Sequence, residues 1–202
     1  MPKSATHENS EFQLRGFNHL ALVCKDMQET VTFYEDILGF RLVKTLQYPD
    51  GGQHFFLDMG NGIDGIAFFW FPDPPPDAPG IARSAAMQGG SAMSAVASMN
   101  HVAFDVAPEL IEEYREKLKS KGIRVTSVVN HADSLNGKHQ PVFGPDDTFV
   151  RSIYFSDPNG IQLEFAAWTH VFTEQDVAHT AKREADLVSH EEKSAEAVAG
   201  GD

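Results

Sequence analysis

Three residues of this sequence have side chains suited to binding a divalent metal ion: His19, His101 and Glu164. The histidines stand 82 residues apart, and each follows an asparagine at the start of a short apolar run. Glu164 is a carboxylate inside the apolar run 161–168, where an unpaired charge would cost several kcal/mol of desolvation free energy. Two imidazoles and one carboxylate leave three adjacent coordination positions open, as in non-haem Fe(II) oxygenases. The residue types therefore predict an open site for Fe(II), and the same ligands accept Mn(II).

Each of these residues also has an ordinary structural interpretation. A single histidine on a strand is usually a hydrogen-bonded residue of intermediate burial. Glu164 could instead face solvent, or pair with Arg151 on the neighbouring predicted strand. The recurrence of the histidine at equivalent places in a repeat favours metal binding over these alternatives.

The repeat covers most of the chain. The run 17–23 recurs as 99–105, and the run 39–43 recurs as 122–126, at offsets of 82 and 83 residues. In each copy, apolar residues with helical spacing predict a helix that ends at a glycine. These residues are Met27, Val31, Tyr34 and Leu38 in the first copy, and Leu110, Ile111, Tyr114 and Leu118 in the second.

Each helix is followed by three predicted strands. The run after the glycine begins one of them, 40–43 or 123–126. Two hairpins with Gly/Asn turns supply the others, 53–59 with 63–71 and 150–155 with 161–168. Each copy thus has the order βαβββ. We expect an α+β protein whose two tandem βαβββ modules form an open, mixed-sheet, barrel-like cleft.

The predicted organisation has five parts. An N-terminal arm (1–14) precedes module 1 (15–71), and a Pro/Gly/Ala/Ser/Met-rich loop (72–98) leads into module 2 (99–168). An acidic tail (169–202) follows, which we expect to be a frayed helix or disordered.

Composition excludes several kinds of partner. The net charge of −13 disfavours nucleic acid, whose binding depends largely on neutralising phosphates. No apolar run approaches the roughly 18 residues of a membrane span. Cys24 is the single cysteine and the start lacks the apolar stretch of a secretory signal, so we expect a cytoplasmic protein. The expected partners are a small molecule and a second copy of the chain, because sheet edges of such modules often pair.

With His19, His101 and Glu164 placed in paired βαβββ modules, the sequence resembles the vicinal-oxygen-chelate superfamily of glyoxalases, bleomycin resistance proteins and extradiol dioxygenases over residues 15–168. The run 153–164 resembles the second half of the extradiol ring-cleavage dioxygenase signature, in which an aliphatic-Tyr pair precedes Asp-Pro-x-Gly and a metal-binding Glu. The resemblance implies that the three residues are iron ligands, and that Tyr154 hydrogen-bonds a substrate hydroxyl.

The number of ligands separates two branches of this superfamily. In glyoxalase-type members, each module donates one ligand from its first strand and one from its last. The last strand of module 1 reads Ile66-Ala67-Phe68-Phe69-Trp70-Phe71 and offers no donor. Three protein ligands suit the binding of a vicinal diol and O2 better than a four-ligand isomerase.

The group that transfers protons is the open question. The signature normally has a histidine six to eight residues before the aliphatic-Tyr pair, but residues 145–147 are Pro-Asp-Asp. Asp64 matches the family's usual acid/base position, and it is equally well a turn aspartate beside Gly65. His54, His131 and His139 are the other candidates considered, although loop histidines are often merely exposed. His139 and His131 flank an insertion of about 15 residues.

The leading expectation is an Fe(II)-dependent extradiol-type dioxygenase that cleaves a catechol-like aromatic with O2. Tyr154 would orient the substrate, and His54, Asp64 or His139 would transfer protons. The candidates for apolar walls are Phe69, Trp70, Phe143 and Trp168. One alternative is a metal-dependent isomerase, lyase or epimerase that uses an enediolate. Another is a non-catalytic, resistance-type protein that binds a drug without a metal.

Overall fold

The computed structural model describes residues 11, 16–75, 96–132, 148–173 and 180–183. Residues 1–171 form one compact unit and residues 172–202 a second. Two of the predicted site residues, His139 and Phe143, lie outside the described residues. No helix in the described ranges is long and apolar enough to cross a membrane.

Module 1 has the predicted βαβββ order. Its strands form a mixed sheet in the order β1-β4-β3-β2, with β1 parallel to β4. Asp26 caps the helix, since its side chain accepts a 2.8 Å hydrogen bond from the Glu29 N–H. The elements are β1 (His19–Val23), α1 (Met27–Thr32), the π-helical turn η1 (Phe33–Ile37), β2 (Arg41–Gln47), β3 (Gln53–Asp58) and β4 (Gly65–Trp70).

Module 2 repeats this arrangement. Its sheet has the order β5-β8-β7-β6, with β5 parallel to β8. The two four-stranded mixed sheets confirm the α+β class, and they are not closed into a barrel. The elements are β5 (Val102–Asp105), the 3-10 turn η2 (Pro108–Leu110), α3 (Ile111–Ser120), β6 (Val129–Ala132), β7 (Thr148–Ser156) and β8 (Gln162–Trp168).

The strand predicted at 123–126 is wrong, because β6 begins only at Val129. The backbone N–H of Thr126 donates to the Tyr154 carbonyl at 3.0 Å. The return bond from the Tyr154 N–H goes to the Thr126 hydroxyl, also at 3.0 Å, rather than to a backbone carbonyl. A side chain thus takes a place in the ladder and delays the strand.

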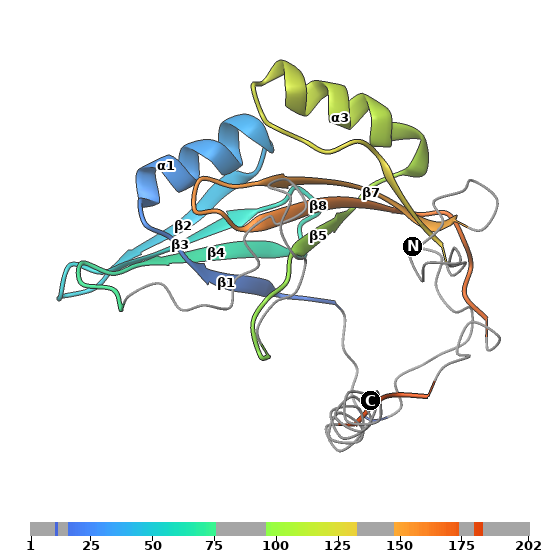
Figure 1. The fold of residues 1–202 in the computed structure, drawn as a ribbon. Helices are drawn as coiled ribbons and strands as arrows, with labels where there is room; N and C mark the ends of the chain where they lie inside the picture. Colours follow the sequence, from blue (N-terminus) through green and yellow to red (C-terminus); the bar gives the residue numbers. More distant parts are fainter. Residues whose placement is uncertain (1–10, 12–15, 76–95, 133–147, 174–179, 184–202) are drawn as a thin grey trace, which may run out of the picture. The chain divides into compact units, whose positions relative to one another are not determined.

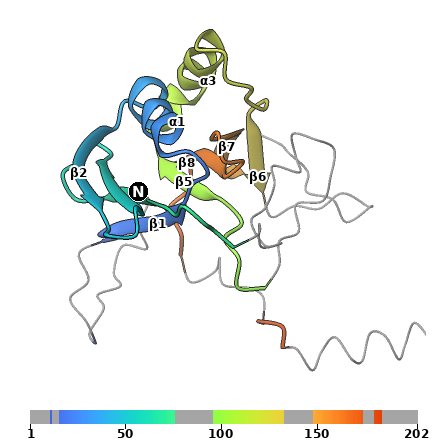
Figure 2. The same ribbon diagram turned by 90° about the vertical axis from the view of Figure 1, so that its left-hand side faces the viewer.

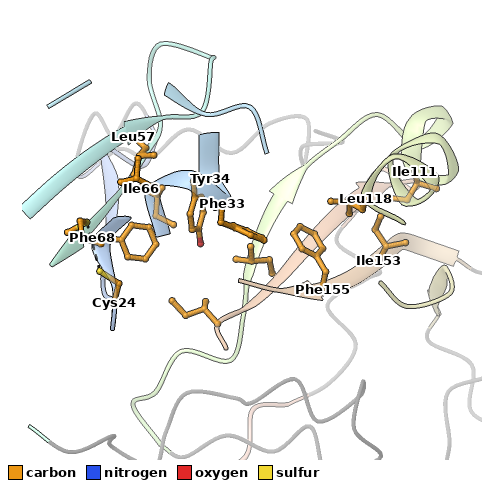
Figure 3. Packing of buried hydrophobic residues seen from close by; sticks show 14 of the residues in the cluster. Cys24, Phe33, Tyr34, Leu57, Ile66, Phe68, Ile111, Leu118, Ile153 and Phe155 are labelled. Carbon is orange, nitrogen blue, oxygen red and sulfur yellow. Dashed lines mark hydrogen bonds between the residues drawn. The ribbon is translucent and has the colours of Figure 1, made fainter. Parts of the chain in front are cut away.

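Both helices lie on the same side of the strands (Figures 1 and 2). The core between helices and strands is one cluster built from both modules, with Phe33 and Tyr34 lying between the groups contributed by each module (Figure 3). Phe40 of module 1 meets Phe104 of module 2 with ring centroids 5.6 Å apart. The opposite face of each sheet, turned away from its helix, carries the predicted metal ligands.

A turn of module 2 is hydrogen-bonded to the helix of module 1. Asn159 accepts a 2.9 Å bond from the Lys25 N–H and donates a 3.0 Å bond to the Thr30 hydroxyl. The buried Tyr34 hydroxyl lies 3.4 Å from the Asp157 carboxylate, whose pKa is raised mainly by burial. These contacts join the Asp-Pro-Asn-Gly turn before β8 to α1.

Candidate metal centre

Two of the three predicted ligands meet on the face of the module 2 sheet that is turned away from α3. His101 Nε2 lies 2.8 Å from Glu164 Oε2, and the Glu164 side chain is only 6% exposed. The hydrogen bond to Glu164 raises the pKa of His101. Burial would raise the pKa of Glu164, but interactions with His101, Ser152 and Tyr154 lower it overall. Glu164 is therefore a buried carboxylate whose ionised form is favoured by its imidazole partner.

The solvent-facing and Arg151-paired alternatives for Glu164 do not hold in this structure. Arg151 turns away from Glu164, with one nitrogen 3.8 Å from Glu112 and another donating to the Pro108 carbonyl at 3.3 Å. In the β7–β8 register, the residue directly opposite Glu164 is Tyr154.

Tyr154 contacts His131, one of the histidines that the sequence offered for proton transfer. The Tyr154 hydroxyl lies 3.0 Å from His131 Nε2 on the neighbouring strand β6. Burial, followed by the nearby Glu164 charge, raises the pKa of Tyr154, so the phenol keeps its proton at neutral pH. Burial lowers the pKa of His131, so the neutral imidazole is favoured, and its ring nitrogen can accept a hydrogen bond from the Tyr154 hydroxyl.

Ser152 adds an unpaired hydroxyl to the same face. Its side chain is fully buried, and within the described ranges its oxygen makes no hydrogen bond of ordinary geometry. It is nevertheless close enough to Glu164 to help lower the pKa of that carboxylate. A buried carboxylate, an imidazole nitrogen facing it and an unsatisfied hydroxyl beside it are a donor set that fits a divalent cation.

His19, the third predicted ligand, is not gathered with this pair. It lies exposed at the start of β1, with its ring edge against Phe56 at a centroid distance of 5.4 Å. In the part of the chain that the structure describes, no three His, Cys, Asp or Glu side chains are grouped to hold a metal ion. His19 and His101 nevertheless share one detail, a 2.7 Å contact from Nδ1 to the side-chain oxygen of the preceding asparagine.

The face of the module 1 sheet that is turned away from α1 is largely aromatic. The strand register places His54, Phe56 and Phe69 on the same face as His19. His54 stacks on Phe69 at 3.6 Å, and its Nδ1 lies 3.2 Å from the Phe68 carbonyl, which can only accept. His54 thus belongs to an aromatic wall and not to the cluster around Tyr154.

Trp70 cannot share a wall with Phe69, because neighbours on a strand point to opposite faces. Its indole N–H donates to the Lys25 carbonyl at 3.0 Å, and the ring lines a shallow pocket at the start of α1. Trp70 therefore lies on the other face of β4 from His19 and Phe69. Trp168, at the end of β8, has the same alternation as Glu164 and lies on its face.

Asp64 lies in a turn, as its alternative interpretation as a turn aspartate predicts. Its carboxylate accepts a 2.9 Å bond from the Asn61 side chain, and its N–H donates to the Asn61 oxygen at 2.9 Å. Of the two histidines considered for proton transfer that the structure describes, His54 and His131, it is His131 that contacts the Tyr154 hydroxyl. No local signal pointed to it, since the register of β6 against β7 is set by tertiary pairing.

Comparison with known proteins gives a family and several distant relatives. The profile described as the Glyoxalase/Bleomycin resistance protein/Dioxygenase superfamily matches residues 16–165. The uncharacterised protein YwkD of Bacillus subtilis is 27% identical over 157 residues, covering 75% of this chain and 95% of that protein. A solved glyoxylase/bleomycin resistance protein/dioxygenase domain from Frankia sp. EAN1pec has a TM-score of 0.55 at 16% identity, covering 81% of this chain and 98% of that domain. That likeness is one of fold.

Two relatives have names that state an activity or a resistance. The fosfomycin resistance protein FosX of Listeria monocytogenes is 28% identical over 112 residues, covering 55% of this chain and 69% of FosX. The putative ring-cleaving dioxygenase MhqE of Bacillus subtilis is 39% identical over 59 residues, covering 28% of this chain and 20% of MhqE.

Proposed function

The chain belongs to the glyoxalase/bleomycin resistance/dioxygenase superfamily, and from this premise we propose that it is a metal-dependent extradiol-type dioxygenase acting on a catechol-like aromatic. One observation carries the proposal. The buried His101–Glu164 pair, at 2.8 Å, shares a sheet face with the Tyr154–His131 pair, at 3.0 Å. A metal-binding pair next to a proton-transfer pair is what activation of a hydroxylated ring requires.

The proposed metal ligands are His19, His101 and Glu164. Fe(II), or Mn(II) in its place, would supply Lewis acidity and an open position for O2 when bound. The protein side chains handle the substrate's proton. The Tyr154 phenol is a hydrogen-bond donor at neutral pH, and neutral His131 accepts a proton passed from a substrate hydroxyl through Tyr154. In this assignment His131 replaces His54, Asp64 and His139 as the acid/base residue.

We also propose that the protein is a cytoplasmic homodimer in which His19 of one copy completes the site of the other. His19 is exposed on β1, which is an edge strand, as β5 is in the other sheet. Apolar residues near it are also uncovered, with Phe17 84% and Val23 51% exposed. An exposed apolar edge with an unused ligand is suited to a second copy of the chain.

The direct test is anaerobic reconstitution with Fe(II), followed by addition of O2 and a panel of catechols. We expect O2 uptake together with a coloured ring-opened product, and Mn(II) reconstitution in parallel identifies the metal. Glu164→Gln is the matched control, because it keeps the size of the side chain and removes the charge. Absence of O2 consumption with every diol, in protein that binds Fe(II), overturns the dioxygenase proposal.

A second candidate function is fosfomycin resistance, favoured by the 28% identity to FosX. Expression in a fosfomycin-susceptible bacterium, with Glu164→Gln as control, separates the two. Resistance that needs Glu164, without diol-dependent O2 uptake, would favour this function. Resistance that persists in Glu164→Gln would instead point to metal-free drug binding.

A further inference from the structure

The two asparagine–histidine pairs make the same contact in different surroundings. Asn18 Oδ1 lies 2.7 Å from His19 Nδ1, and Asn100 Oδ1 lies 2.7 Å from His101 Nδ1. His19 is exposed, whereas the His101 side chain is 34% exposed and packed against Glu164. Because the contact is unchanged between these environments, it is a property of the repeated dipeptide and not of the packing around it.

The chemistry of the contact fixes which nitrogen carries a proton. An amide oxygen can only accept, so Nδ1 must be the donor in both pairs. A neutral imidazole has one N–H, and with that proton on Nδ1 the lone pair lies on Nε2. In module 2 that same Nε2 donates to the Glu164 carboxylate at 2.8 Å, and a metal ion would bind Nε2 in place of this proton. The asparagine therefore selects the nitrogen that faces the site.

The pair on the exposed histidine is the informative one. A hydrogen bond between exposed side chains replaces bonds to water and contributes little to stability, while holding both side chains costs conformational entropy. Stability alone gives no reason for a 2.7 Å contact at His19. A histidine that must present Nε2 to a ligand gains from being held in advance.

We propose that Asn18 and Asn100 are positioning residues of the metal site, each holding Nδ1–H of the next residue so that Nε2 is directed to the metal. The proposal rests on the proposed function, because it assumes that His19 and His101 bind the same ion. It assigns a task in the site to two residues outside the ligand set.

Mn(II) titration followed by electron paramagnetic resonance of the free ion tests the proposal without an activity assay. We expect Asn18→Ala and Asn100→Ala each to weaken Mn(II) binding about 10- to 100-fold, as loss of outer-shell partners does. Asn100→Asp keeps an acceptor oxygen in place and should restore most of the affinity. Asn130→Ala, on β6 and facing away from His131, is the matched control and should bind as wild type does.

A second readout distinguishes positioning from a structural role. In Zn(II)-loaded protein with labelled histidine nitrogens, the wild-type Nδ1–H of His101 should be visible and slow to exchange. In Asn100→Ala it should exchange rapidly, while the thermal unfolding of the metal-free protein stays unchanged. Wild-type Mn(II) affinity in both alanine variants, or no recovery in Asn100→Asp, overturns the proposal. A wild-type chain that binds no Mn(II) overturns the metal site and this proposal together.

Discussion

The two modules have the same topology, but the sheet faces turned away from their helices carry different kinds of side chain. In the strand registers, Ala103 pairs with Glu164 in module 2, and the repeat-equivalent Ala21 pairs with Ala67 in module 1. Glu164 in turn pairs with Tyr154, whereas Ala67 pairs with Phe56. Module 1 thus has alanine and phenylalanine where module 2 has a carboxylate and a phenol.

The two halves of the duplicated fold therefore offer different surfaces. Both modules keep the asparagine–histidine pair at the first strand, and within the described residues only module 2 pairs a carboxylate with a phenol on its last two strands. Module 1 instead offers a surface of His54, Phe56 and Phe69, suited to packing against an aromatic ring. Ala67 also occupies the place of a fourth ligand, which agrees with a three-ligand, open site.

The largest loss of metal affinity and activity should come from replacing Glu164 by alanine, the residue that module 1 has at the equivalent position. Glu164→Ala removes the charged ligand, so we expect Mn(II) and Fe(II) affinity to fall more than the roughly 100-fold typical of outer-shell losses, together with all activity. Asp64→Ala, in the turn before β4, is the control and should retain the metal. Metal analysis by mass spectrometry measures both, and full occupancy in Glu164→Ala would remove this residue from the site.

Tyr154→Phe copies the Phe56 of module 1 into module 2. We expect it, and His131→Gln, to lower kcat about 100- to 10,000-fold while Mn(II) affinity changes little, because in the proposed function both side chains transfer protons and neither binds the metal. Steady-state kinetics with the best diol of the panel measures the effect. A variant with normal kcat would show that the residue has no part in proton transfer.

Mixing two variants that each lack one proposed histidine ligand tests whether His19 and His101 of one metal site come from the same chain or from two chains. His19→Ala and His101→Ala should each fail to bind Mn(II) at wild-type affinity. After unfolding and joint refolding, about a quarter of the wild-type sites should return, since half of randomly formed dimers carry one intact pair. No recovery in a mixture that still dimerises would place His19 and His101 of the same chain in one site.

The smallest expected effect is a pH dependence of the chelated, metal-free protein. The raised pKa of His101 gives stability that is present below its ordinary value of 6.5 and is lost as the pH rises through the folded value. The lowered pKa of Glu164 gives stability that is present above 4.5 and is lost as the pH falls through its folded value. We therefore expect Tm to fall above pH 6.5 by more in wild type than in Glu164→Gln. Equal curves would contradict this pairing.

Much of this architecture could be predicted because its signals are local. The duplicated Asn-His run, the helical spacing and the turn glycines are readable within a few residues, and so is a carboxylate in the apolar run that forms β8. Alternation along β4 could also have separated Phe69 from Trp70. The contact of His131 with Tyr154 could not be predicted, because strand register across an insertion depends on tertiary pairing. The late start of β6 likewise depends on one threonine hydroxyl.

The turn that joins module 2 to α1 bears on whether the two modules could fold as separate chains. Asp157 and Tyr34 are both buried, and each lies in a different module. A chain divided between the modules would leave a carboxylate and a phenol facing water on surfaces shaped to meet each other. Strand β8, which carries Glu164, starts just after this turn. The contacts between α1 of module 1 and this turn of module 2 therefore help to fix the position of Glu164.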